Sequence, residues 1–262
     1  MSNAATNFNK LVESRRSVRL FDEEDEFDSS AVIRSLKRAV LAPNSSNLQL
    51  WSFYHVKSPE KKNILAQLCL SQPAALTARE LVVVATRRDL WRKHVDFMLS
   101  ILTKGNENGV KVKSTKDTGK VLQRITEDKE TRKKAVLQYY SKIMPQLYTM
   151  DALGIQGWFK RLYVSLFMAP KKPTYRNVTL ADLRIITHKS AALAAQTFML
   201  SMNAEGYDTC PLEGIDTLRI KRFLNLPKMA EICMVIACGK AKPEGIYGPR
   251  IRVKNSEVIH TL

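Results

Sequence analysis

The chain has 262 residues, and 45% of them are hydrophobic, which suffices for a sizeable globular core and excludes a disordered protein. Its 42 basic and 25 acidic residues give a formal net charge of +17, which favours anionic partners such as phosphates, nucleic acid or an anionic membrane surface. The four cysteines and four histidines show no metal-ligand spacing, and the amino terminus lacks the apolar core of a signal peptide. No uncharged stretch reaches the ~20 residues of a membrane-spanning helix, so we expect a cytoplasmic protein without a metal site.

Two helices are predicted before Pro43. Apolar residues at helical spacing predict a first helix over Ala5–Ser14, which ends where an arginine cluster begins. A second helix starts at Ser29 or Ser30, either of which can cap it, and runs until Pro43 with one apolar face.

The elements after this point indicate a central sheet. A strand is predicted over Trp51–Val56, followed by a helix that opens at Ser58-Pro59, where proline at the first helical position costs little. The apolar runs Leu81–Ala85 and Glu231–Cys238 are typical of strands covered on both faces. A long helix over Thr179–Ala204 becomes apolar nearly all round, which is typical of a core helix or a subunit contact.

The segment from about 91 to 176 differs from the rest in composition. Residues 104–134 are rich in Lys, Asn, Thr and Glu and predict a basic loop and a solvated helix. Beyond it, large apolar residues recur at helical spacing around Lys160 and Arg161; they are Trp158, Phe159, Leu162, Tyr163, Leu166 and Phe167. We expect an amphipathic helix packed on the body of the protein. The alternatives are a cap over an active site and an interfacial helix on anionic lipid.

Two arginine clusters lie at opposite ends of the chain. The candidate phosphate ligands in them are Arg15, Arg16, Ser17, Arg19, Arg250 and Arg252. Guanidinium groups and a hydroxyl can surround the oxygens of a phosphate. Between the clusters lies the uncharged polar loop 43–49, whose donors and acceptors suit a ring system with carbonyls and ring nitrogens. Together they suggest a cofactor with a phosphate at one end and a polar heterocycle at the other.

Four separated pieces of sequence strengthen this interpretation: ESRRSVRLF at 13–21, APNSSNLQLW at 42–51, GYDTCPLEG at 206–214 and GPRIR at 248–252. In this order they are similar to the opening R-x-S-x-R/K-x-F/Y signature, the A-P-S-x-x-N-x-Q-P-W loop, the turn after a long apolar helix and the C-terminal arginines of one family. The chain resembles the nitroreductase family of FMN-dependent oxidoreductases. Asn44 and Leu50 depart from the Ser and Pro usual in that loop. The similarity does not extend to the segment between residues 90 and 180.

The resemblance implies a fold and a site. The fold would be α+β, a three-layer α-β-α sandwich around a mixed, mainly antiparallel sheet, forming an intertwined homodimer. Residues 1–262 would be one domain with a helical basic insertion at about 91–176. The two arginine clusters would hold the FMN phosphate, and the loop would serve the cofactor of the partner subunit. The remaining implied FMN-binding residues are Pro43, Asn44, Ser45, Asn47, Gln49, Gln72, Pro211, Leu212, Glu213 and Gly214, the last four as a turn that presents backbone N–H groups to flavin N5.

The implied activity is reduction of an electron-poor acceptor, such as a nitroaromatic or a quinone, with NADH or NADPH in a ping-pong cycle. No side chain is expected to be catalytic, because the flavin carries the electrons. Two alternatives remain open. The first keeps the fold and FMN for specialised chemistry such as dehalogenation. The second is a basic protein that binds nucleic acid or anionic lipid; we expect neither a nucleic-acid partner nor membrane contact through 156–172.

Overall fold

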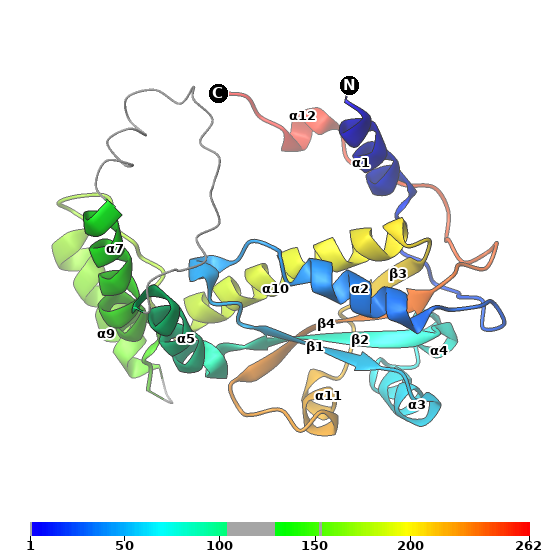
Figure 1. The fold of residues 1–262 in the computed structure, drawn as a ribbon, viewed down its shortest axis with the longest axis horizontal. Helices are drawn as coiled ribbons and strands as arrows, with labels where there is room; N and C mark the ends of the chain where they lie inside the picture. Colours follow the sequence, from blue (N-terminus) through cyan, green and yellow to red (C-terminus); the bar gives the residue numbers. More distant parts are fainter. Residues whose placement is uncertain (1, 104–128, 152–153) are drawn as a thin grey trace.

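A four-stranded antiparallel sheet lies at the centre of the computed structural model, which describes residues 2–103, 129–151 and 154–262 (Figure 1). The strand order is β1-β2-β4-β3. The strands are β1 (Trp51–Val56), β2 (Glu80–Arg87), β3 (Asp208–Leu212) and β4 (Ala230–Gly239). The continuous apolar runs predicted as covered strands become β2 and β4, the two central strands, which pair with each other from Glu80↔Cys238 to Arg87↔Ala230.

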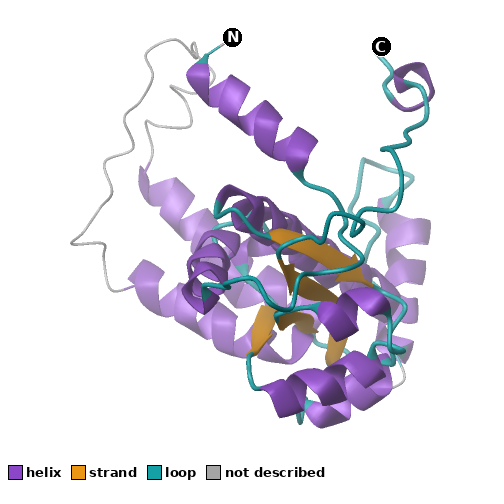
Figure 2. Cartoon of the chain, turned by 90° about the vertical axis from the view of Figure 1, so that its right-hand side faces the viewer, coloured by secondary structure: helices purple, strands orange, loops and turns teal. Residues whose placement is uncertain are grey.

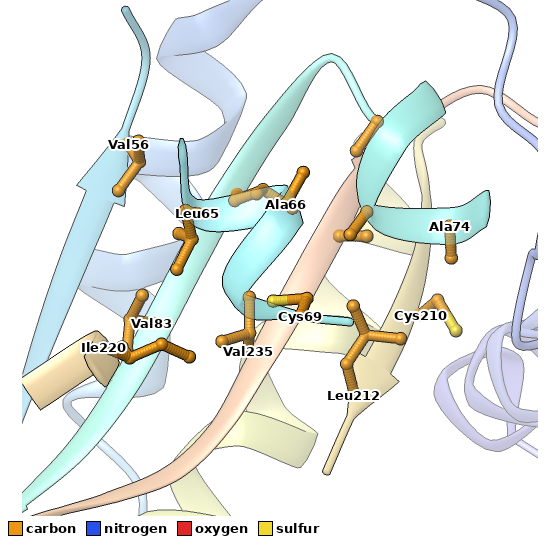
Figure 3. Packing of buried hydrophobic residues seen from close by; sticks show 14 of the residues in the cluster. Val56, Leu65, Ala66, Cys69, Ala74, Val83, Cys210, Leu212, Ile220 and Val235 are labelled. Carbon is orange, nitrogen blue, oxygen red and sulfur yellow. The ribbon is translucent and has the colours of Figure 1, made fainter. Parts of the chain in front are cut away.

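Helices cover both faces of the sheet, so the fold is a three-layer sandwich. Side chains of β2 alternate between the faces: Leu81, Val83 and Ala85 point to one core cluster, and Val82 and Val84 to another. The first cluster packs under α3, α4 and α11, and Figure 3 shows its members interlocking across β2, β3 and β4. The second packs under α2 and α10 (Figure 1). The helices of these two layers are α2 (Ser29–Ala39), α3 (Pro59–Leu68), α4 (Pro73–Thr77), α10 (Leu180–Ala204) and α11 (Thr217–Phe223).

The helix starts follow the predicted chemistry with one correction. Ser58 caps α3, and Thr179 caps α10 in a reciprocal capping box with Asp182. Neither Ser29 nor Ser30 caps α2. That role belongs to Asp28, whose carboxylate accepts a hydrogen bond from the Ser30 N–H at 2.8 Å, because a side chain one position earlier reaches the same orphan donors.

Strand β3 is absent from the sequence-based expectation, which placed Pro211 and Leu212 in a turn. The structure pairs them with Ile236 and Val235 of β4, so the turn begins only at Glu213. Proline cannot donate to a sheet ladder and therefore argues against a strand. It is tolerated here because β3 is an edge strand.

The insertion is largely helical where it is described. Its elements are η2 (Arg88–Leu90), α5 (Trp91–Thr103), α7 (Lys129–Gln138), the π-helical η3 (Tyr139–Ile143), α8 (Met144–Tyr148), α9 (Ile155–Tyr163) and the π-helical η4 (Val164–Met168). A third core cluster, which includes Trp91, Met144 and Tyr148, joins α5, η3 and α8 to Leu48 and to Leu183 of α10. Most of the predicted basic loop at 104–134 lies outside the described residues.

Both ends of the chain extend from the same side of the body (Figures 1 and 2). They carry α1 (Asn3–Ser14) and α12 (Asn255–Val258), neither of which has a buried residue. Exposed apolar side chains line both ends, among them Phe8 at 56% and Ile251 at 79% of full exposure. We call α1 and residues 249–262 the terminal arms.

A cluster of three polar residues joins α10 to β4. Glu231 accepts hydrogen bonds from Arg184 Nε at 2.7 Å and pairs with His188 Nε2 at 3.1 Å. Hydrogen bonds to Cys233 and Glu231 raise the pKa of His188 to about 9. Hydrogen bonds from His188 and Arg184 lower the pKa of Glu231 to about 2.

This cluster predicts how stability depends on pH. The contribution of Glu231 is present above its ordinary pKa of 4.5 and is lost as the pH falls toward 2. The contribution of His188 is present below its ordinary pKa of 6.5 and is lost as the pH rises through about 9. The Tm difference between the wild type and Glu231→Gln should therefore be largest between pH 4.5 and 6.5 and shrink on either side. A difference independent of pH in calorimetry would contradict this.

Gly245 generates a second prediction. A Cβ at this buried position would overlap the Leu20 carbonyl oxygen and lie 2.9 Å from the Lys242 carbonyl oxygen, both of them backbone atoms. We expect Gly245→Ala to lower the free energy of unfolding by about 1–3 kcal/mol in urea titrations, the usual cost of overpacking. Its exposed neighbour gives the matched control: Glu244→Ala should leave the urea midpoint of unfolding unchanged. Equal urea midpoints for both variants would contradict this prediction, because they would show that the backbone around residue 245 moves to accommodate the Cβ at no cost.

Candidate functional site

The two arginine clusters meet in one cavity of about 280 Å³. It is lined by Arg15, Arg16, Ser17, Arg19, Ile246, Tyr247, Pro249, Arg250, Ile251 and Arg252. All six of the predicted phosphate ligands are among these residues, and no carboxylate is. Residues separated by more than 230 positions in the sequence therefore form a single cationic surface.

Backbone hydrogen bonds bring the clusters together at the edge of the sheet. Ser17 forms a parallel bridge with Thr209 of β3, and the Val18 N–H donates to the Thr209 carbonyl at 3.2 Å. The Arg19 N–H donates to the Gly245 carbonyl at 2.6 Å. The first cluster is thus fixed both to the sheet and to the segment that leads to the second cluster.

Arg250 also holds α1. Its guanidinium donates to the carbonyl oxygens of Arg15 at 2.6 Å, Glu13 at 3.0 Å and Val12 at 3.2 Å. The last carbonyls of a helix lack partners within the helix and attract cations. Arg250 therefore both lines the cavity and ties one terminal arm to the other, a role that the sequence did not predict.

The cavity concentrates positive charge that no acidic side chain of its lining offsets. Burial lowers the pKa of Arg15, and the nearby charges of Arg250, Arg252 and Arg16 lower it further. Behind the site, burial raises the pKa of the Cys210 thiol, against the opposing effect of Arg19 and Arg15. A dianion in the cavity would relieve the repulsion among the arginines. The donors present, several guanidinium groups and the Ser17 hydroxyl, fit the oxygens of a phosphomonoester.

A second group of predicted residues lies just past β3. The side-chain amide of Gln72 donates hydrogen bonds to the Gly214 carbonyl at 2.7 Å and to the Cys69 carbonyl at 3.1 Å, so it holds the turn in place. Among the described residues, the backbone N–H groups of Glu213 and Gly214 have no acceptor, and both residues are exposed. A Cβ on Gly214 would meet Gln72 only at 3.6 Å, an ordinary contact. The subunit's own atoms therefore do not require glycine at this position.

The polar loop is held in a tight conformation by its own side chains. Asn44 Oδ1 accepts from the Gln49 N–H at 2.8 Å, and Ser46, Asn47 and Gln49 all have positive φ, near 50°. Asn and Gln in this left-handed region are less strained than branched residues would be. The Ser45 N–H donates to Ser190 Oγ on α10 at 3.2 Å.

The insertion supports this loop. Tyr139 OH lies 2.6 Å from Ser46 Oγ, and Tyr140 OH donates to the Ser46 carbonyl at 2.8 Å. These tyrosines were not among the predicted site residues, nor was Tyr247 in the arginine cavity. Only Tyr247 had a usable sequence signal, since it directly precedes the Gly248-Pro249-Arg250 piece.

Within one subunit the loop does not reach the arginine cavity, and Pro43 to Gln49 are absent from its lining. The loop is anchored at Ser190 of α10, whereas the first arginine cluster lies beside Asn203, whose amide donates to Leu11 O and Ser14 Oγ. Thirteen residues of helix separate these anchors, a distance of roughly 20 Å at 1.5 Å per residue. The predicted site is thus divided into two parts along α10.

Comparisons with known proteins agree with these features. The sequence matches the model of the Nitroreductase family over residues 12–240. A Bacillus subtilis (strain 168) protein named "Putative NAD(P)H nitroreductase YdgI" is 24% identical over 247 residues, 94% of each chain. The "CLA biosynthesis enone reductase" of Lactiplantibacillus plantarum is 24% identical over 92% of this chain and 88% of its own.

Solved structures share the fold. The nitroreductase ydfN of Bacillus subtilis, itself described as putative, superposes with a TM-score of 0.67 at 19% identity over 98% of this chain and 100% of its own. A "putative nitroreductase in complex with FMN" from Exiguobacterium sibiricum 255-15 gives a TM-score of 0.63 at 22% identity over 97% of each chain. No helix among the described residues is long and apolar enough to cross a membrane. The family match spans most of the sequence, and the α+β sandwich predicted for the fold is confirmed: the chain belongs to the nitroreductase family of oxidoreductases.

Proposed function

We propose that the protein is an FMN-dependent oxidoreductase that uses NADH or NADPH to reduce an electron-poor acceptor. The observation that carries this proposal is the arginine cavity, which residues from both ends of the chain form and whose lining has no carboxylate. Bound FMN would supply the chemistry by accepting a hydride equivalent from the nicotinamide and passing electrons to the acceptor.

The protein's own residues would bind and orient the cofactor. Arg15, Ser17 and Arg19, with Arg252 opposite, would hold the phosphate through charge-assisted hydrogen bonds. The unpaired N–H groups of Glu213 and Gly214 would donate to the polar edge of the ring, with Gln72 keeping the turn in place. N–H dipoles near the ring favour its anionic reduced form, so this turn would help to set the reduction potential.

A homodimer would complete the site. The polar loop is separated from the arginine cavity of its own subunit, so Asn47 and Gln49 would contact the cofactor of the partner subunit. The exposed apolar side chains of the terminal arms support this proposal, because arms without a buried residue gain stability by packing on another chain.

The insertion borders the polar loop through Tyr139 and Tyr140 and would therefore shape access to the ring. Assays should compare nitroaromatics and quinones with activated alkenes, since one relative is named an enone reductase. Halogenated aromatics belong in the same panel, because dehalogenation is the alternative within this fold.

The phosphate assignment predicts a loss of FMN affinity. Arg15→Ala removes a charge-assisted contact of about 1.5–3 kcal/mol and should weaken FMN binding roughly ten- to a hundredfold in fluorescence titrations of the apoprotein. Arg222→Ala, an exposed arginine on α11, removes the same charge outside the cavity and should leave the affinity unchanged. Equal affinities for both variants, or wild-type protein that binds no FMN, would contradict the proposal.

The divided site predicts complementation between two impaired variants, assayed at an FMN concentration that saturates only the wild type. Arg15→Ala and Gln49→Ala homodimers would each have two defective sites. A mixed dimer contains one site with both residues intact, because each site takes its arginine from one subunit and its loop from the other. Differently tagged subunits, purified as the mixed dimer, should recover about half of the wild-type activity per dimer. Absence of recovery in a verified mixed dimer would place both residues in the same subunit's site.

A further inference from the structure

The amphipathic helix of the insertion turns its apolar side outward. Seven large side chains along α9 and η4, which we call the α9 stripe, are all between 41% and 59% exposed: Ile155, Trp158, Phe159, Leu162, Tyr163, Leu166 and Phe167. The sequence-based expectation was that this face would pack on the body. It is wrong, because the inward face consists of other residues.

Within α9 a small and a polar residue form that inward face, and the buried Val164 continues it in η4. Gly157 is buried, and a Cβ there would lie 3.1 Å from the Thr179 Cα, so the helix approaches the start of α10 through its glycine. Lys160 turns inward as well, donating to the Gln146 carbonyl at 2.6 Å and the Thr149 carbonyl at 2.9 Å. Burial lowers the pKa of this lysine. The polarity of α9 is therefore opposite to that of an ordinary surface helix.

The charged residues of the segment that carries the stripe are basic, and the carboxylate of Asp151 caps its N-terminal end by accepting from the Ile155 N–H at 2.9 Å. Between Asp151 and Asp182 the sequence has no acidic residue. It has five basic residues there, namely Lys160, Arg161, Lys171, Lys172 and Arg176, and all but Lys160 are exposed. An apolar stripe with aromatic residues, in a segment with four exposed cations, is the composition that partitions into the interface of an anionic bilayer.

The stripe lies apart from the terminal arms. In Figure 1, α9 is at the left edge of the molecule, whereas the terminal arms, which carry apolar side chains expected at a dimer interface, extend from its top. A cavity of about 600 Å³ also opens beside the stripe, lined mainly by apolar residues such as Tyr163, Val164 and Met168, with Lys160 and Lys172 in the same lining. Its volume suits an acyl chain, and the exposed Lys172 suits an anionic headgroup.

We propose that the α9 stripe and its flanking basic residues form a docking surface for an anionic membrane, on which the protein binds peripherally. The apolar side chains enter the interfacial region of the bilayer, and Arg161, Lys171, Lys172 and Arg176 contact its headgroups. This surface is separate from the arginine cavity and does not depend on the bound cofactor.

Vesicle sedimentation of the full-length protein tests this proposal. We expect binding to vesicles of phosphatidylglycerol and phosphatidylcholine, weakening as salt is added, and none to phosphatidylcholine alone. The double substitution Phe159→Gln, Leu166→Gln should reduce binding at least tenfold, since each side chain loses its apolar transfer. The matched control is Leu218→Gln on α11, an equally exposed apolar residue at 58%, which should bind as wild type.

Two further variants isolate the electrostatic contribution. Lys171→Gln with Lys172→Gln should weaken binding roughly fivefold per charge. Arg222→Gln with Lys228→Gln removes the same net charge from exposed positions near α11 and should have little effect. Equal losses in the two pairs would mean that the +17 charge binds any polyanion through its whole surface, and would overturn the proposal.

Tryptophan fluorescence gives a readout that does not depend on these substitutions. Trp158 is 58% exposed, whereas Trp51 and Trp91 are each 7% exposed. Adding anionic vesicles should shift the emission to shorter wavelength, and Trp158→Phe should abolish the shift while still binding. No sedimentation and no shift with wild-type protein would overturn the proposal. A change from dimer to monomer in the Phe159→Gln, Leu166→Gln variant would also overturn it, by showing that another copy of the chain covers the stripe.

Discussion

Mutual repulsion among five arginines is the constraint that the contacts around the site must offset. Guanidinium groups from both ends of the chain converge on a cavity that has no carboxylate in its lining, and partial burial of Arg15 increases the cost of its charge. Such an arrangement persists only if other interactions hold the chain ends in place. Here the Ser17–Thr209 bridge, the Arg19–Gly245 hydrogen bond and the contacts of Arg250 with α1 supply them. Binding an anion would convert this repulsion into affinity.

Much of the fold follows from local sequence signals. The bounds of β1, the Ser58-Pro59 start of α3 and the course of α10 were predicted because apolar periodicity and capping chemistry agree there. Strand β3 escaped prediction because Pro211 argues against a strand unless the strand is known to lie at an edge. Whether a strand lies at the edge of a sheet depends on pairing between distant segments, which a local sequence pattern does not reveal.

The candidate site was likewise predicted only in part from the sequence. Residue type and order indicated which side chains would gather, and all six predicted phosphate ligands do line one cavity. The sequence did not predict that Arg250 would bind the carbonyls at the end of α1, or that Tyr139 and Tyr140 would support Ser46. These contacts join segments about 90 to 240 residues apart. Their geometry is fixed by packing of whole elements and not by any motif.

Residues 155–167 show where periodicity stops being informative. The spacing of Trp158, Phe159 and Leu162 identifies one apolar face, but spacing alone does not determine what that face contacts. The orientation is determined by the opposite side of the helix, where Gly157 allows close approach to Thr179 and Lys160 donates hydrogen bonds to backbone carbonyls. Because the face with Gly157, Lys160 and the buried Val164 is the one that fits the body, the aromatic face points outward. In this helix Gly157 marks the buried face, whereas the large aromatic residues mark the exposed one.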